Sequence, residues 1–452
     1  PVLIVNQEMV IRLGAVTGVG HARLIRERFG RFWGWFSVGD LFVLNFLTIV
    51  TEFIGVSLAL EYFGVSKYVA VPVAALALIA MTATGSFRRW ERSMYVFVFA
   101  NLLVIPLLIM GHPHWGAVVH DSFVPGIRGG ASSAAVLLII AIVGTTVAPW
   151  QLFFQQSNIV DKRITPRWIN YERVDTVIGA LIVVLGAGAL MAVAAFAFDG
   201  TGDSGHFKDA GVTAHALGQR LGGAAGTMFA IILLNASMIG AAAVTLSTSY
   251  AFGDITGAKH SLHRGFRDAR TFYTMFSGLV LVAAGIVLIP GAPLGLITTA
   301  VQALAGILLP SATVFLLMLC NDRAVLGPWV NRSWLNALAV AIIGVLVALS
   351  LILMATTLYR SINVPVLAKW LGVVLAVGLA VGVAIAWRSR VRRPAEPPVA
   401  IEDPRTWTMP PLALLERPTW SAGRRAGMAV LWGYLLLAVG LLVVKVFQLA
   451  GG

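Results

Sequence analysis

Long apolar runs follow one another along almost the whole chain, separated by short polar or basic loops. Eleven of these runs have about the 20 residues that a helix needs to cross a membrane. A β-barrel would instead show alternating segments of roughly ten residues. The pattern therefore predicts an all-α membrane protein with spans near 37–63, 67–84, 93–111, 131–160, 174–199, 223–253, 271–290, 294–320, 334–359, 364–387 and 426–449.

The composition excludes a soluble enzyme. Of the 452 residues, 58% are hydrophobic and only 12% are charged, whereas soluble domains carry about 25% charged residues. Cys320 is the single cysteine, so an internal disulfide and a cysteine-rich metal site are both excluded. The first 14 residues are apolar over about half a span. We expect them to be the end of a helix that starts before residue 1.

The basic residues predict the orientation in the membrane. Of the 33 Lys and Arg residues, 26 lie in alternate loops, from residues 12–31 to residues 388–425. Basic loops of membrane proteins face the cytoplasm, so we expect a multi-pass plasma-membrane protein, in bacteria an inner-membrane one. Its formal net charge of +13 then reflects topology and contact with anionic lipids. We expect neither a nucleic-acid partner nor an obligate protein partner.

A break is expected within the span 131–160. Pro149 lies in its middle, lacks a backbone N–H and disfavours helical geometry at the residue before it. We expect the helix to unwind near 144–149 and to leave carbonyl groups of Thr145 to Ala148 facing a cavity. Free carbonyls beside broken helices hold cations in transporters. A proline kink satisfied by neighbouring threonines is the alternative.

Two further polar side chains lie inside spans. Glu52 is a carboxylate within TIVTEFIGVSLAL, where it either titrates or pairs with a neighbouring helix. Gln302 offers one hard oxygen in QALAGILLP, either for a metal ion or for an interhelical hydrogen bond. Together with the break they supply oxygen ligands only. No catalytic triad or nucleotide-binding loop accompanies them, so the pattern favours a transporter without a cofactor.

Four motifs resemble the Nramp divalent-metal transporters. QEMVIRLGAVTG is similar to their second helix and its loop, TEFIGVSLAL to the third, GTTVAPW to the broken sixth and QALAGILLP to the tenth. The similarity runs from residue 1 to about 359. It implies an inverted-repeat, LeuT-like core whose broken first and sixth helices meet at the midplane.

This resemblance also implies the domain organisation. Residues 1–130 would be the remainder of the first repeat and 131–320 the second repeat, broken at 144–149. Residues 321–452 would add peripheral helices and a cytoplasmic linker at 389–425. The family's Asp-Pro-Gly-Asn motif, which belongs to the first helix, does not occur in the sequence. We therefore expect that first helix to be missing from these 452 residues.

The sixth-helix motif departs from the family at its metal ligand. Nramp metal transporters read Ala-Thr-Val-Met-Pro-His there, and the methionine sulfur binds Mn²⁺ or Fe²⁺. The matching methionine position is Ala148. Losing a soft thioether removes discrimination against hard cations, and oxygen ligands suit partly hydrated Mg²⁺. The chain is in this respect similar to the Nramp-related magnesium transporters.

Two titratable groups of the family are also replaced. Trp150 stands at the histidine position, and Ile49 stands where the third helix of the family carries an acidic residue that takes part in proton movement. Glu52 retains the second acidic position. We therefore expect Ile49, Glu52, Pro149 and Trp150 to act in gating or residual conformational coupling rather than in obligatory proton coupling.

The resemblance and these departures predict uptake of Mg²⁺, with Mn²⁺ also accepted, by alternating access. The expected ligands are the carbonyls of Thr145 and Ala148 and the amide of Gln302, with the Thr146 hydroxyl as a further candidate. One alternative is a proton-coupled Mn²⁺/Fe²⁺ symporter that uses another sulfur, such as Met238 or Met318. The other is an amino-acid or organic-solute carrier on the same scaffold.

Overall fold

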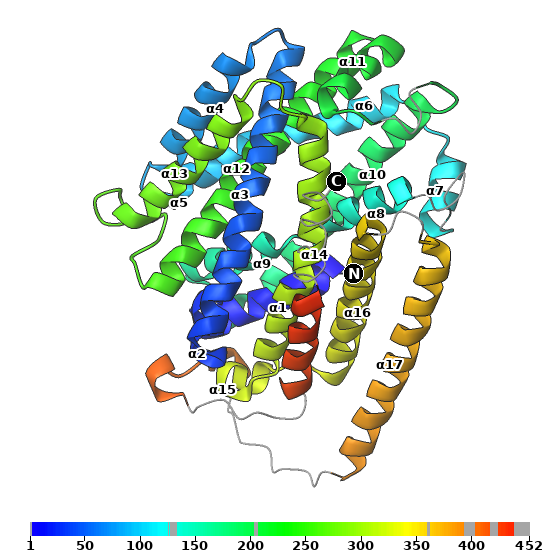
Figure 1. Cartoon of the computed structure of the whole chain (residues 1–452). Helices are drawn as coiled ribbons and strands as arrows, with labels where there is room; N and C mark the ends of the chain where they lie inside the picture. Colours follow the sequence, from blue (N-terminus) through cyan, green and yellow to red (C-terminus); the bar gives the residue numbers. More distant parts are fainter. Residues whose placement is uncertain are drawn as a thin grey trace, which may run out of the picture. The chain divides into compact units, whose positions relative to one another are not determined.

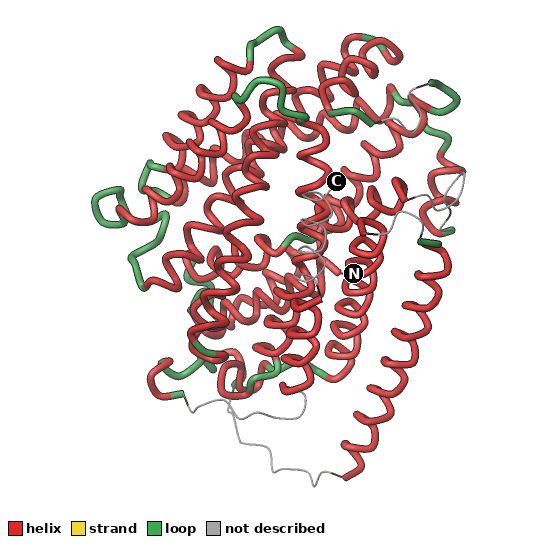
Figure 2. Tube along the Cα trace, in the orientation of Figure 1, coloured by secondary structure: helices red, strands yellow, loops and turns green. Residues whose placement is uncertain are grey.

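The regular structure of the chain is helical throughout the residues that a computed structural model describes (Figures 1 and 2). These are residues 2–124, 126, 133–202, 207–358, 362–392, 403–415 and 424–437. By its internal contacts the chain divides into two units, which are considered separately. Helices α3, α10 and α14 each begin in one unit and end in the other.

Unit 1 combines residues 1–37, 127–176 and 302–452. In it, α1 packs on α9 and α16 on α17 (Figure 1). The first pair approaches closely at Gly14, where a Cβ atom would lie 3.0 Å from Cγ2 of Ile159. Its elements are α1 (Val2–Thr17), α2 (His21–Phe29), α8 (Ser133–Thr146), α9 (Pro149–Asp161), η2 (Pro166–Trp168), α15 (Arg323–Leu326), η3 (Gly327–Trp329), α16 (Ser333–Leu358), α17 (Val364–Arg392), η4 (Pro404–Thr406) and η5 (Leu412–Leu414).

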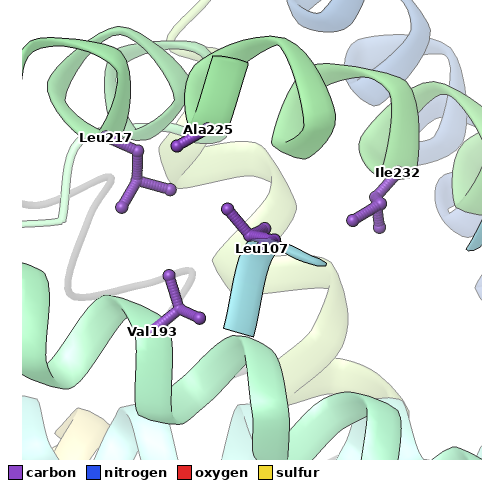
Figure 3. Close-up of a cluster of buried hydrophobic side chains, with 5 residues drawn as sticks. All are labelled: Leu107, Val193, Leu217, Ala225 and Ile232. Atoms are coloured by element: carbon purple, nitrogen blue, oxygen red, sulfur yellow. The ribbon is translucent and has the colours of Figure 1, made fainter. Parts of the chain in front are cut away.

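Unit 2 combines residues 38–126 and 177–301. One of its apolar clusters joins Leu107 on α6 and Val193 on α10 to Leu217, Ala225 and Ile232 of α11 and α12 (Figure 3). Its elements are most of α3 (Arg31–Tyr62) and of α10 (Ile169–Phe198), the start of α14 (Leu294–Cys320), whose larger part lies in unit 1, and α4 (Lys67–Thr82), α5 (Phe87–Ala100), η1 (Asn101–Leu103), α6 (Val104–Met110), α7 (Trp115–Phe123), α11 (Ala210–Leu221), α12 (Gly223–Thr256) and α13 (Arg270–Val287).

Within the described ranges, eight helices are long and apolar enough to cross a membrane, and α1 with α2 would form a ninth span bent by 78°. The run expected at 67–84 is the shorter helix α4, which Ser66 caps at its start. The run expected at 131–160 consists of α8 and α9. Of the last expected span, residues 426–437 are helical and the remainder lies outside the described residues.

Several arginines expected in cytoplasmic loops are buried in ion pairs of unit 1. Arg12 lies inside α1, 3.0 Å from the Glu8 carboxylate, and also donates to the Asn331 side chain at 2.6 Å. Glu8 accepts a second ion pair from Arg173 at 2.6 Å. These bonds connect α1 to the start of α10 and to the segment before α16. They also compensate the charges of Arg12, Glu8 and Arg173 within one cluster.

Asp322 lies between two further buried arginines. Its Oδ2 atom is 2.8 Å from Nη2 of Arg28 and 3.6 Å from Nη1 of Arg424. The Arg424 guanidinium also lies 4.5 Å above the ring of Phe29. Burial lowers the pKa of Arg424, while the Asp322 carboxylate opposes this shift. The cluster thereby attaches the helix at 424–437 to α2 and α15.

The linker segment at 403–415 is docked on unit 1. The N–H of Met409 donates to the carbonyl of Val16 at the end of α1, at 3.0 Å. The indole of Trp407 covers Gly327, where a Cβ atom would lie 2.5 Å from the ring. This contact and a positive φ of 49° both require glycine at position 327. Part of the expected linker therefore makes defined contacts with the rest of unit 1.

Replacing Asp322 with Asn tests the buried cluster. We expect Asp322→Asn to destabilise the protein by about 3–5 kcal/mol, because breaking a buried ion pair leaves uncompensated charge. Thermal unfolding of the purified protein in detergent would show a midpoint lower by several degrees. The matched control is Asp121→Asn, since Asp121 pairs with His120 while both side chains are more than 60% exposed. Equal midpoints for the two variants would contradict this role.

Candidate functional site

The broken helix lies between α8 and α9. Helix α8 ends at Thr146, α9 begins at Pro149, and Ala148 between them is extended, with φ −99° and ψ 152°. The break is shorter than the expected 144–149, because α8 continues through Gly144. The Thr146 hydroxyl donates back to the carbonyl of Ile142 at 2.7 Å, which supports this last turn.

Carbonyl groups at the break are the expected cation ligands. Because Pro149 has no N–H, the carbonyl of Thr145 lacks its usual helical donor. The side chain of Thr145 is outside the described residues. The carbonyl of Ala148 accepts from the N–H of Gln151 at 3.1 Å, and its second lone pair is available to a ligand. Val147 and Ala148 are both buried, whereas Thr146 is exposed.

Gln302 and Trp150 belong to the same unit as the break. Gln302 is half-buried on α14. The next residue, Ala303, packs in an apolar cluster with Ile352 and Val364. Trp150 is half-buried at the start of α9, with its ring centroid 6.3 Å from that of Phe154. Unit 1 thus contains all of the expected metal ligands.

Sequence reasoning missed two glutamines on α9. The Oε1 atoms of Gln151 and Gln155 are buried and have no hydrogen-bond partner among the described residues. The neighbouring Gln156 differs, since its amide bonds His21 and the carbonyl of Val19, both at 2.7 Å. Gln151 and Gln155 are four residues apart and so share a helix face. Three amides in the run QLFFQQ, which begins two residues after Pro149, were the signal that could have identified them.

Ile49 and Glu52 belong to unit 2, on α3. Ile49 is fully buried. Glu52 is half-buried, and its carboxylate lies against Gly240 of α12, where a Cβ atom would be 2.5 Å from the carboxylate carbon. Within the described part of the chain, no group donates a hydrogen bond to this carboxylate. Gly240 was also missed, because its role depends on a neighbour almost 200 residues away.

The chemistry available at the break is that of oxygen ligands. Backbone carbonyls, a threonine hydroxyl and glutamine amides are hard ligands, which bind Mg²⁺, Ca²⁺ and Mn²⁺ rather than soft metals. Across the described ranges, no three His, Cys, Asp or Glu side chains gather as a metal cluster would require. Oxygen atoms are therefore the ligand type that these residues supply.

Comparison with known proteins identifies the family. A family model described as "Natural resistance-associated macrophage protein-like" (Nramp) matches residues 1–356. Among curated proteins, divalent metal cation transporter MntH 1 of Pseudomonas aeruginosa is 28% identical, covering 77% of this chain and 80% of its own length. MntH of Bacillus subtilis is 26% identical, covering 78% and 81%. A solved structure of the Eremococcus coleocola manganese transporter superimposes with a TM-score of 0.60 at 20% identity, over 86% of each chain.

These matches agree with the helical architecture. The inverted-repeat, LeuT-like fold expected from the motifs is confirmed by the structural similarity. The apolar helices and the bacterial relatives indicate a multi-pass protein of the bacterial plasma membrane. The chain is thus a transporter rather than an enzyme, and because the family match covers residues 1–356, it belongs to the Nramp family.

Proposed function

We propose that the chain imports divalent metal cations, with Mg²⁺ as a main substrate and Mn²⁺ also accepted, by alternating access without obligatory proton coupling. Divalent metal cation transport is the activity named for its relatives. The preference for Mg²⁺ is carried by one observation. The family's methionine position in the α8–α9 break is occupied by Ala148, which is buried and offers the ion only a backbone oxygen.

Oxygen ligands favour Mg²⁺ for a physical reason. Mg²⁺ is small, binds oxygen almost exclusively and usually keeps several water molecules in its octahedral shell. A methyl group at position 148 leaves more room for such water than a thioether would. The unpartnered amide oxygens of Gln151 and Gln155 add acceptors for these waters, beside the expected ligands Thr145, Thr146 and Gln302.

A proton-coupled Mn²⁺/Fe²⁺ symporter is the alternative, and it needs a sulfur ligand from elsewhere in the chain. Met238 lies in unit 2, where it lines an apolar pocket of about 250 Å³ with Leu60 and Leu234. Met318 lies in unit 1 with its sulfur 3.1 Å from the position of a Cβ atom on Gly427. Neither of these contacts involves a residue of the α8–α9 break, which favours the magnesium proposal.

An amino-acid or organic-solute carrier is the remaining alternative. Such a carrier needs a site that binds an organic anion or amine, and the named relatives transport metal cations or manganese instead. Competition by labelled amino acids distinguishes the two classes, because a metal carrier should not respond to them.

The membrane potential provides a sufficient driving force without protons. An inside-negative potential contributes about 2.3 kcal/mol per elementary charge and per 100 mV. For a divalent cation this contribution doubles. Uptake can therefore proceed although Ile49 and Trp150 provide no titratable group at the two positions where the family has one.

Reconstitution in liposomes tests the proposal directly. We expect saturable Mg²⁺ entry, followed with an internal dye, and no acidification of the lumen read in parallel with a pH indicator. Mn²⁺ should enter too and should compete with Mg²⁺. Mn²⁺ entry with acidification and without Mg²⁺ flux would instead identify the proton-coupled symporter.

Restoring a thioether at the break should change the ion preference. We expect Ala148→Met to lower the ratio of Mg²⁺ to Mn²⁺ uptake about tenfold, a difference of 1.4 kcal/mol, because sulfur binds the softer ion better and displaces water. The control is Ala141→Met, which adds the same side chain at another buried position of α8. The interpretation of Ala148 would be wrong if both variants changed the ratio equally, or if neither did.

Removing the Gln302 amide should weaken ion binding. We expect Gln302→Leu to raise the KM for Mg²⁺ about tenfold, again 1.4 kcal/mol, since one oxygen ligand is lost. Uptake rates at graded Mg²⁺ concentrations measure this. The control Gln219→Leu removes an exposed amide on α11 and should keep the original KM. An unchanged KM in Gln302→Leu would leave this glutamine as a structural residue.

A further inference from the structure

Helices α3 and α12 meet along an antiparallel seam, formed by residues 45–57 of α3 and 235–248 of α12. Three contacts fix its register. Asn45 donates to the Thr248 hydroxyl at 2.8 Å, Glu52 lies against Gly240, and Ser237 lies against Gly55. Each step forward along α3 is matched by a step back along α12, so the two helices run in opposite directions within unit 2.

The middle of the α3–α12 seam is a reciprocal pair of recesses. At Gly240 a Cβ atom would lie 2.5 Å from the carboxylate carbon of Glu52 and 2.7 Å from its Oε2 atom. At Gly55 a Cβ atom would overlap the Ser237 hydroxyl and lie 3.2 Å from its Cβ. Each helix thus presents a glycine three residues from the side chain that it inserts into its partner. Small residues permit such close approach of membrane helices.

Polar groups dominate the seam around Glu52. Ser57 and Asn235 continue the same register, and both are at least nine-tenths buried. The Ser57 hydroxyl and the Nδ2 atom of Asn235 have no hydrogen-bond partner among the described residues, and neither has the Oδ1 atom of Asn45. Buried polar atoms of this kind are commonly satisfied by ordered water. The contact with the Glu52 carboxylate that the structure shows from the side of α12 is at Gly240.

We propose that Gly240 is a positioning residue for Glu52, and that the recess which it forms couples the Glu52 carboxylate to α12 during the transport cycle. The inference rests on the proposed function, in which Glu52 acts in conformational coupling. Gly240 does not contact the ion; it acts by leaving space for a carboxylate. A methyl group at position 240 would overlap the Glu52 carboxylate and would therefore force it out of the recess.

The pair of recesses provides its own control. Ser237 in the Gly55 recess is a neutral side chain held by the same geometry on the same two helices. A general packing defect in the seam should appear equally at both recesses. An effect on transport that depends on the carboxylate should appear only at Gly240. Two double-mutant cycles, read by thermal unfolding and by uptake, separate these cases.

The first cycle consists of Gly240→Ala, Glu52→Ala and the double variant. The second cycle consists of Gly55→Ala, Ser237→Ala and their double variant. All variants are made in the full chain, and the two cycles are compared. We expect both glycine variants to unfold at lower temperature, and removal of the inserted side chain to restore stability in each cycle. In liposomes, Gly240→Ala should lower Mg²⁺ uptake on the order of tenfold and alter its dependence on pH, since displaced groups lose activity steeply. Adding Glu52→Ala should not restore uptake, whereas Gly55→Ala with Ser237→Ala should transport normally.

Two results would overturn the proposal. One is normal uptake with an unchanged pH profile in Gly240→Ala. The other is additive rather than compensating stability changes in the cycle of Gly240→Ala and Glu52→Ala, which would show that the carboxylate does not occupy the recess. If Gly240→Ala alone fails to fold, the double variant still provides the stability comparison with Glu52→Ala.

A separate variant distinguishes failure of the underlying function. If Glu52→Gln, which keeps the shape of the side chain, leaves the uptake rate and ion preference unchanged, the coupling role of Glu52 is wrong and so is the proposal for Gly240. If the liposomes show proton-coupled Mn²⁺ entry instead, the substrate proposal fails. The stability cycles still decide in that case whether Gly240 positions Glu52.

Discussion

A helix in a lipid bilayer has to satisfy its own backbone hydrogen bonds, and Pro149 makes this impossible at one point of the chain. The carbonyl four residues before it has no helical donor, and the backbone is extended at Ala148. Such a break is tolerated inside a membrane only where protein or a water-filled cavity surrounds it. The proline therefore leaves polar backbone exposed at the break, and the proposed ion preference depends on the residue beside it, Ala148.

In unit 2, close contact between the backbones of two helices is as important as the broken helix is in unit 1. Glycines at 55 and 240 allow α3 and α12 to approach until a hydroxyl and a carboxylate fill the space that a side chain would take. Dispersion and hydrogen bonding, rather than the hydrophobic effect, hold helices together in a bilayer. In the proposed coupling, a carboxylate held in such a recess is displaced when the opposite helix moves. Transport cycles that depend on helix movement can make use of this sensitivity.

Local features were predictable from the sequence, and features that depend on distant neighbours were not. Spans such as α12 and α16 follow from continuous hydrophobicity, and the break follows from one proline in an apolar run. The role of Gly240 depends on Glu52, and the unpartnered state of Gln155 depends on what surrounds it, so neither has a local signature. The ion pairs of Arg12 were missed for the same reason, since charge counting assigned that arginine to a loop.

The segment at 403–415 lies beyond the region that the family model matches, yet it is fastened to residues inside that region. Trp407 covers Gly327, and Trp329 donates to the carbonyl of Pro404 at 2.8 Å. The two parts of the chain are therefore not interchangeable modules. A chimera that joined this C-terminal part to the core of a relative would bring the indole against whatever side chain that relative carries in place of Gly327. The packing of positions 327 and 407 is thus interdependent.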